Sequence, residues 1–214
     1  MFIKISYGFL QFYFLHGNDT LDSSLAKKGF TRDDITDVIL THLHFDHCGG
    51  SIVRDGEQLV PAFKNAIYWS NEGHWNWAIH PNDREKASFL KENILPIKAS
   101  GQLHFIASPE VKKTDPGDPH VTNPALLSMP FNEEISLRFV NGHTHAMMLP
   151  QIRYKGRNII FMADLLPSIA HIPLPYIMAY DMFPLATLSE KKSFLGEAQE
   201  KNYILFFSFC VYKF

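Results

Sequence analysis

Three histidines and an aspartate occur within six residues of this sequence, directly after a short apolar stretch. The segment reads Thr41-His42-Leu43-His44-Phe45-Asp46-His47-Cys48-Gly49-Gly50, and Val38-Ile39-Leu40 precedes it. If a strand ends at His42, the alternation of extended chain places His42 and His44 on the same side. Asp46 and His47 then continue into a turn closed by two glycines. The segment therefore predicts that several imidazoles converge on one point at a strand end.

Neutral imidazole nitrogen and carboxylate oxygen are ligands preferred by zinc, and also by iron or manganese. A set without thiolates is more typical of a catalytic metal site than of a structural one, so Cys48 is not expected to be a ligand. The alternative is a group of separate surface histidines or an adventitious cluster. The HxHxDH order favours a metal or catalytic site over that alternative.

The segment from Thr41 to Gly50 resembles the first signature of the metallo-β-lactamase superfamily of metal-dependent hydrolases. Two further motifs follow in the order that this family requires, and they read Val140-Asn141-Gly142-His143-Thr144 and Ile159-Ile160-Phe161-Met162-Ala163-Asp164. Each is weak alone and gains weight from order and spacing. The resemblance implies a first metal on His42, His44 and His143, a second held with the help of Asp46 and His47, and Asp164 as the bridge. The implied cofactor is one or two Zn²⁺ ions, with Mn²⁺ or Fe²⁺ as alternatives.

The resemblance also implies an α+β fold, a four-layered αββα sandwich, in one domain over residues 1–214 with a helical cap insertion at about 71–100. Patterning predicts strands at 65–70, 135–140, 151–155 and 158–162, with a tight turn at Lys155-Gly156-Arg157. A helix is expected over 82–94, with Glu85, Lys86, Lys91 and Glu92 facing outward. Thr187 and Glu190 form a capping box for a helix reaching about residue 201, and 203–210 returns to strand.

Both ends of the sequence depart from the family pattern, so we expect an incomplete fold. The usual opening strand pair is replaced by an aromatic-rich run over 1–15. The run has no signal-peptide cleavage site and is too short to span a membrane, so it is interpreted as a buried strand or a misfit start. The last ligand histidine is expected near Phe209 and is missing. Cys210 is either a substitute ligand or a small buried hydrophobe, and the latter is favoured. We therefore expect one metal to bind more tightly than the other.

Several other residues have two interpretations. Trp75, Trp77, Phe89 and Leu90 would wall an apolar pocket or, as we prefer, pack in the core. His74 and His80 are expected at the surface or at a pocket rim. His145 would be a third metal ligand or, as we prefer, a rim residue. His171, on a proline-bounded loop, would contact the substrate or would be a hydrogen-bonded loop histidine, with Asp181 as a candidate partner. Residues 112–124 are expected to form a loop.

Composition is that of a globular protein with one sizeable core, since 46% of the residues are hydrophobic and 20% are charged. The net charge of −2 and the lack of a basic patch argue against a nucleic-acid partner. We also expect no membrane partner. Two cysteines give no disulfide framework, which favours a reducing compartment such as the cytoplasm.

The implied activity is metal-assisted hydrolysis of an ester-type carbonyl in a small-molecule substrate. Asp46 would orient the attacking water and relay its proton, and Asp164 is the second catalytic candidate. The run Ala163-Asp164-Leu165-Leu166-Pro167 and the Trp-rich insertion resemble the lactonase branch, so an N-acyl-homoserine lactone is the first expected substrate. Thioester hydrolysis of the glyoxalase II type and phosphotriester hydrolysis remain open. The alternative of a different class is a truncated, catalytically impaired metal-binding remnant.

Overall fold

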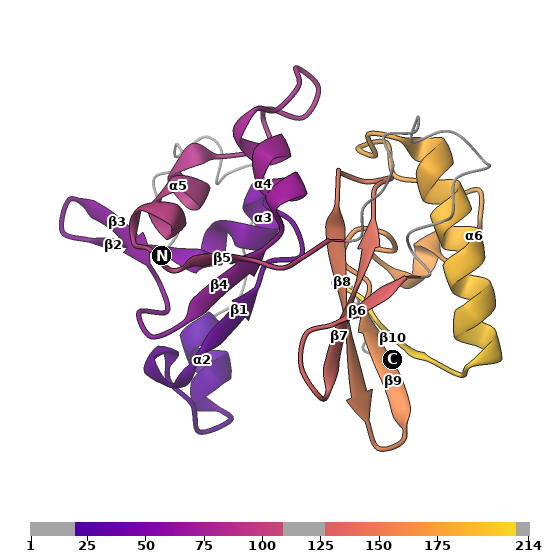
Figure 1. Cartoon of the computed structure of the whole chain (residues 1–214), viewed down its shortest axis with the longest axis horizontal. Coiled ribbons are helices and arrows are strands. Elements are labelled where there is room, and N and C mark those ends of the chain that lie inside the picture. Colours follow the sequence, from indigo (N-terminus) through magenta and orange to yellow (C-terminus); the bar gives the residue numbers. More distant parts are fainter. Residues whose placement is uncertain (1–19, 109–126, 209–214) are drawn as a thin grey trace. The chain divides into compact units, whose positions relative to one another are not determined.

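The computed structural model of the chain describes residues 20–108 and 127–208 (Figure 1). The interpretations of residues 1–15 and 112–124, and those of Phe209 and Cys210, lie outside these residues. The chain divides into two compact units. Among the described residues, the first unit comprises 20–70 and 78–105, and the second comprises 71–77, 106–108 and 127–208. A single domain over 1–214 with a cap at 71–100 stays a prediction.

The first unit is built around a parallel sheet. Its strands among the described residues lie in the order β1 (Asp37–Ile39), β4 (Ile67–Ser70) and β5 (Leu103–Phe105). A hairpin of β2 (Ile52–Asp55) and β3 (Gln58–Pro61) accompanies it, together with helices α2 (Leu21–Ala26), α3 (Phe45–Cys48) and α5 (Lys91–Ala99) and the 3-10 turns Arg32–Asp34 and Gly49–Ser51. Leu43, Tyr68 and Ile97 are fully buried. The predicted strand at 65–70 is confirmed as β4, two residues shorter.

The helix predicted over 82–94 is wrong at its N-terminal half. Residues 83–88 form turns, and α5 begins only at Lys91. The Oδ1 atom of Asn82 accepts hydrogen bonds from the backbone N–H of Arg84 (2.9 Å) and Glu85 (3.0 Å). Such side-chain acceptors compete with helical hydrogen bonding and favour turns. The expectation that Glu85 faces outward is also wrong, because this side chain is only 3% exposed.

The second unit contains a sheet whose order is β10-β9-β8-β7-β6. Its strands are β6 (Ser128–Pro130), β7 (Ile135–Val140), β8 (Met147–Tyr154), β9 (Arg157–Phe161) and β10 (Ile204–Phe206). The first four form an antiparallel meander, and β10 joins β9 in parallel. Lys155 and Gly156, with φ of +48° and +74°, make the predicted tight turn between β8 and β9. This confirms the meander, although β8 begins four residues earlier than predicted.

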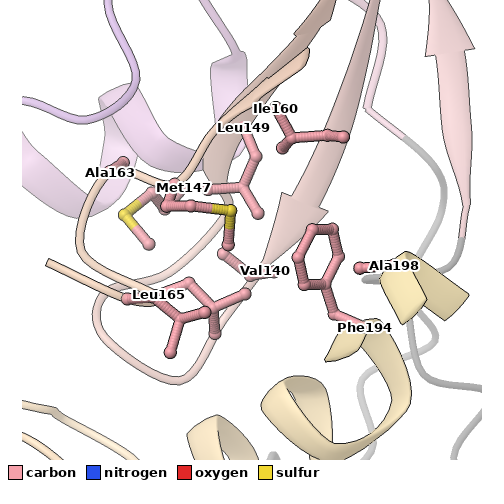
Figure 2. Close-up of a cluster of buried hydrophobic side chains, with 10 residues drawn as sticks. Val140, Met147, Leu149, Ile160, Ala163, Leu165, Phe194 and Ala198 are labelled. Atoms are coloured by element: carbon pink, nitrogen blue, oxygen red, sulfur yellow. The ribbon is translucent and has the colours of Figure 1, made fainter. Parts of the chain in front are cut away.

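Helix α6 (Pro184–Glu200) packs against this sheet and forms the core of the second unit. Figure 2 shows Phe194 and Ala198 of the helix facing Val140, Leu149 and Ile160 of the strands. The helix begins three residues before the predicted Thr187, with Pro184 at its first turn, where a missing N–H costs nothing. Thr187 and Glu190 are therefore inside the helix, and the predicted capping box is wrong.

The remaining regular elements among the described residues are one helix and one 3-10 turn. Helix α4 (Glu72–Ile79) follows β4, and the 3-10 turn Ile169–His171 follows β9. No helix within residues 20–108 and 127–208 combines the length and apolar character needed to cross a bilayer. The mixture of helices with parallel and antiparallel sheets confirms the predicted α+β class.

Candidate functional site

The HxHxDH segment comes after β1, a strand of the parallel sheet of the first unit. β1 ends at Ile39, and Leu40 makes a last sheet-like hydrogen bond from its N–H to the carbonyl of Trp69 (3.0 Å). The expected strand end at His42 is therefore three residues too late, because the partner strand β4 ends at Ser70. His42 lies in the connecting segment, and His44 is the N-cap of α3.

The imidazoles of His42, His44 and His47 form a cluster, as predicted. The ring centroid of His42 lies 4.7 Å from that of His44 and 4.1 Å from that of His47. His42 and His44 are buried, and the Nδ1 atom of His42 lies 3.1 Å from the hydroxyl oxygen of Thr41. The Asp46 carboxylate lies 3.5 Å from Nε2 of His47 and is 45% exposed. The cluster therefore combines two buried imidazoles with one carboxylate that is open to solvent.

The thiol of Cys48 takes no part in this cluster as a ligand. It is completely buried and donates a hydrogen bond to the carbonyl of Leu43 (3.3 Å). Burial raises the pKa of Cys48 to about 12, which disfavours its thiolate form.

A buried carboxylate contacts the cluster at a position that the sequence patterning missed. The Oε1 atom of Glu85 lies 2.9 Å from Nε2 of His44, and the two side chains are 3% and 8% exposed. The Phe89 ring packs on the same imidazole, with centroids 4.8 Å apart. Glu85 looked like one of several solvent-facing charges of an amphipathic helix, and no local motif distinguishes it from Lys86 or Glu92.

His143 and Asp164 come together in the second unit. Each follows a strand end by three residues, after β7 and β9 respectively, as the motifs predicted. Nε2 of His143 lies 3.4 Å from a carboxylate oxygen of Asp164. Its Nδ1 lies 2.9 Å from the carboxylate of Asp181, which is itself buried. The expected pairing of Asp181 with His171 is therefore wrong, because Asp181 contacts His143.

The turn that carries His143 is fixed by helix α6. The carboxylate of Glu190 accepts the backbone N–H of Asn141 (2.7 Å) and of Gly142 (3.0 Å). Burial raises the pKa of Glu190 to about 8, although both N–H donors favour its charged form. The carbonyls of Gly142 and His143 accept the N–H groups of Phe183 (2.8 Å) and Met182 (3.1 Å).

The other end of the same turn is held by residues 71–77. Nδ2 of Asn71 donates to the carbonyl of Ala146 (2.8 Å), and Nδ1 of His74 donates to the carbonyl of His145 (2.6 Å). Ala146 donates its N–H to Oδ1 of Asn141 (2.9 Å) and has a φ of +53°. The turn 141–146 thus keeps its shape through partners from three segments of the second unit.

Replacing Gly142 with alanine should destabilise the protein by about 1–3 kcal/mol or more, because the new methyl group overpacks the contact with α6. A Cβ atom at Gly142 would lie 2.2 Å from the Thr187 hydroxyl and 2.4–2.5 Å from backbone atoms of Thr187. Backbone atoms cannot rotate away, so the turn itself has to shift. Denaturant unfolding of the wild type and Gly142→Ala measures this loss.

Gly196→Ala is the matched control for this prediction. Gly196 is an exposed residue of α6, and a Cβ there would meet nothing within 4 Å. This change should leave stability unaltered or raise it by up to about 1 kcal/mol, because alanine is the better helix former. Equal stability of Gly142→Ala and the wild type would contradict the close contact with Thr187.

The remaining histidines take different positions. His74 is completely buried, so its predicted surface or rim position is wrong, whereas His80 is exposed. His145 is half-buried, with its ring 5.5 Å from that of Trp77. His171 is half-buried, and its Nδ1 lies 2.9 Å from the Ser168 hydroxyl.

The four apolar residues considered for a pocket wall fall into a buried pair and a half-buried pair. Trp75 and Phe89 are 2% and 5% exposed, which confirms core packing for these two. Trp77 and Leu90 are half-buried, and Trp77 packs near Phe183, with ring centroids 6.3 Å apart.

Ligand chemistry fits a divalent metal ion. Five of the predicted ligand residues each offer a ligand atom that could hold a metal ion, and they are His42, His44, His47, His143 and Asp164. All five supply imidazole nitrogen or carboxylate oxygen, the donor set favoured by zinc and its neighbours in the first transition row. Carboxylates also contact one ring nitrogen of His44 (Nε2, from Glu85) and Nδ1 of His143 (from Asp181), and such contacts are common around metal-bound histidines.

Comparison with known protein families decides the relationship. A family profile described as the metallo-beta-lactamase superfamily matches residues 11–208. The chain belongs to this superfamily. All three sequence motifs, including the six predicted ligand residues, lie inside the matched residues. No curated protein sequence matches the chain significantly.

Solved structures show the same fold at low sequence identity. A probable metal-dependent hydrolase from Staphylococcus aureus matches with a TM-score of 0.79 and 23% identity, over 96% of this chain and 65% of its own. A dizinc quorum-quenching lactonase, AidC, matches with a TM-score of 0.67 and 21% identity, over 88% and 62% of the two chains. An N-acyl homoserine lactone hydrolase with its product at the catalytic metal centre matches with a TM-score of 0.62 and 20% identity, over 87% and 60%. The chain thus spans less than two thirds of the length of each of these solved structures.

Proposed function

We propose that this protein is a metal-dependent hydrolase of small esters or lactones. The observation that carries the proposal is the buried cluster of His42, His44 and His47, which belongs to a superfamily motif and consists of good metal ligands. We further propose that His143, Asp164 and Asp46 complete one metal centre with the cluster. Zinc is the first candidate ion, supported by the dizinc lactonase of the same fold, and manganese or iron are alternatives.

Two carboxylates would assist a metal ion bound at this site, Asp181 by holding a ligand and Asp46 by proton transfer. A bound divalent ion would activate a water molecule and polarise the ester carbonyl. Asp181 would hold His143 through Nδ1, so that Nε2 is the ligand atom. Asp46, which is partly exposed beside His47, would accept the proton of the attacking water and deliver it to the leaving alkoxide.

We propose an N-acyl-homoserine lactone as the substrate, because lactone hydrolases recur among the solved structures with this fold. His171 would contact the substrate, since its half-buried ring follows Asp164 by seven residues and is fixed by Ser168. The buried free thiol of Cys48 is compatible with a cytoplasmic location.

Metal removal and restoration test the proposal. The purified full chain is stripped with a chelator, dialysed, and assayed for opening of N-hexanoyl homoserine lactone with and without added zinc or manganese. We expect no hydrolysis after stripping and recovery with at least one of the two ions. A glutathione thioester and an aryl phosphotriester, assayed in parallel, separate the other substrate classes. A rate that is independent of metal, or no rate with any substrate and ion, would contradict a metal-dependent hydrolase.

A further inference from the structure

The contact between Glu85 and His44 is made by two buried side chains of the first unit. The Oε1 atom of Glu85 lies 2.9 Å from Nε2 of His44. A buried carboxylate is costly unless a positive charge or several hydrogen bonds compensate it. An imidazole that binds a cation through its other nitrogen compensates more of this cost than a neutral imidazole does. The pair is therefore better suited to a metal-bound His44 than to a structural hydrogen bond.

The backbone around Glu85 is shaped to deliver its side chain to this position. Oδ1 of Asn82 holds the N–H of Glu85 (3.0 Å), and the carbonyl of Glu85 accepts the N–H of Ser88 (2.9 Å). The carbonyl of Ser88 in turn accepts the N–H of Phe45, the residue after His44 (2.9 Å). The turn that carries Glu85 is thus tied directly to the backbone that carries His44.

A carboxylate has acceptor atoms and no donor, so the nitrogen that faces Glu85 has to carry the hydrogen. In the neutral imidazole the other nitrogen, Nδ1, then presents its lone pair. We propose that Glu85 is a positioning residue that fixes His44 in the Nε2–H tautomer and presents Nδ1 to the metal ion. This role rests on the proposed function. It adds a residue outside the three sequence motifs to the machinery of the site.

Two measurements on the full chain test the role of Glu85. The first is the tautomer of His44 in the metal-free protein, from two-bond ¹H–¹⁵N correlation NMR, where we expect Nε2–H in the wild type and loss of this preference in Glu85→Ala. The second is zinc affinity, measured by competition with a chromophoric chelator. Glu85→Ala should bind zinc about 10- to 100-fold more weakly. Glu85→Gln keeps an acceptor oxygen, so it should keep the tautomer and lose less affinity.

Glu92→Gln is the charge-matched control, since Glu92 is exposed on α5 and should leave both measurements unchanged. Circular dichroism confirms that each variant is folded at the assay temperature. If the wild type binds zinc and Glu85→Ala binds it equally well, or if His44 carries its hydrogen on Nδ1, the positioning role is overturned while the hydrolase proposal survives. If the wild type binds no zinc, manganese or iron, the proposed function fails, and the role of Glu85 toward a metal fails with it.

Discussion

Replacing His42 with alanine should lower zinc affinity by more than about 100-fold, because loss of a direct ligand costs more than the 10- to 100-fold expected for its hydrogen-bonded partners. Metal-dependent lactone hydrolysis should fall to the rate of the metal-free protein. His42 is completely buried, and its ring lies within 4.7 Å of the rings of both His44 and His47. The alanine variant therefore lacks the imidazole that lies beside both of the other two rings. Chelator competition and a lactone-opening assay measure the two effects.

His80→Ala is the matched control, because His80 is an exposed histidine close in sequence to α4. It removes an exposed imidazole that is not a predicted ligand, and it should leave zinc affinity and hydrolysis unchanged. Wild-type affinity and rate in His42→Ala would show that the cluster does not hold the ion.

Replacing Arg138 with methionine should destabilise the protein by about 3–5 kcal/mol, the cost of removing one partner of a buried ion pair. The guanidinium donates two hydrogen bonds to Glu197 (2.8 and 2.9 Å) and one to Gln151 (2.8 Å). The side chains of Arg138 and Glu197 are 3% and 13% exposed. Methionine fills much of the volume but leaves the Glu197 carboxylate without this partner. Denaturant unfolding at neutral pH measures the loss.

The exposed pair of Arg153 and Glu134, with side chains 63% and 64% exposed, provides the control. Arg153→Met should cost less than about 1 kcal/mol, because solvent screens an exposed pair. An Arg138→Met loss as small as that of Arg153→Met would contradict the importance of the buried network.

The pH dependence of the Arg138→Met loss gives a second signature. Hydrogen bonds from Arg138 hold the pKa of Glu197 at about 2, below its usual 4.5. A lowered carboxyl pKa contributes stability that is present above pH 4.5 and disappears as the pH falls toward about 2. The difference in unfolding free energy between the wild type and Arg138→Met should therefore shrink over this range. A difference that stays constant down to pH 2 would contradict the assignment to Glu197.

The sequence predicted best what depends on local order along the chain. The strand β7, the Lys155-Gly156 turn and the final helix followed by a strand were all visible as patterns of apolar and turn-forming residues, although the helix begins before the predicted capping box. The clustering of His42, His44 and His47 was predictable because their spacing is short. His143 and Asp164 were found through motif order, and the structure does bring these two together.

Contacts between distant segments were not predictable in this way. Glu85 is 41 residues from His44, and Glu190 is 48 residues from Gly142, and each occupies a position that is ordinary for a solvent-facing or capping carboxylate. The Asn82 side chain interrupts a helical pattern that propensity alone supports. Asp181 was assigned to the nearer histidine, His171, although its partner in the fold is His143. In each case a tertiary contact outweighed the local preference.

The hydrogen bonds and packing contacts that hold the turn 141–146 have a consequence for metal binding. Glu190 and Thr187 are one helical turn apart on α6. Glu190 accepts the backbone N–H of Gly142, and Thr187 packs closely against the same residue, which directly precedes His143. The conformational entropy of this loop is thus already lost when the polypeptide folds. A cation arriving at His143 would meet an imidazole in its final place, so that little of the binding energy is diverted into ordering the receptor.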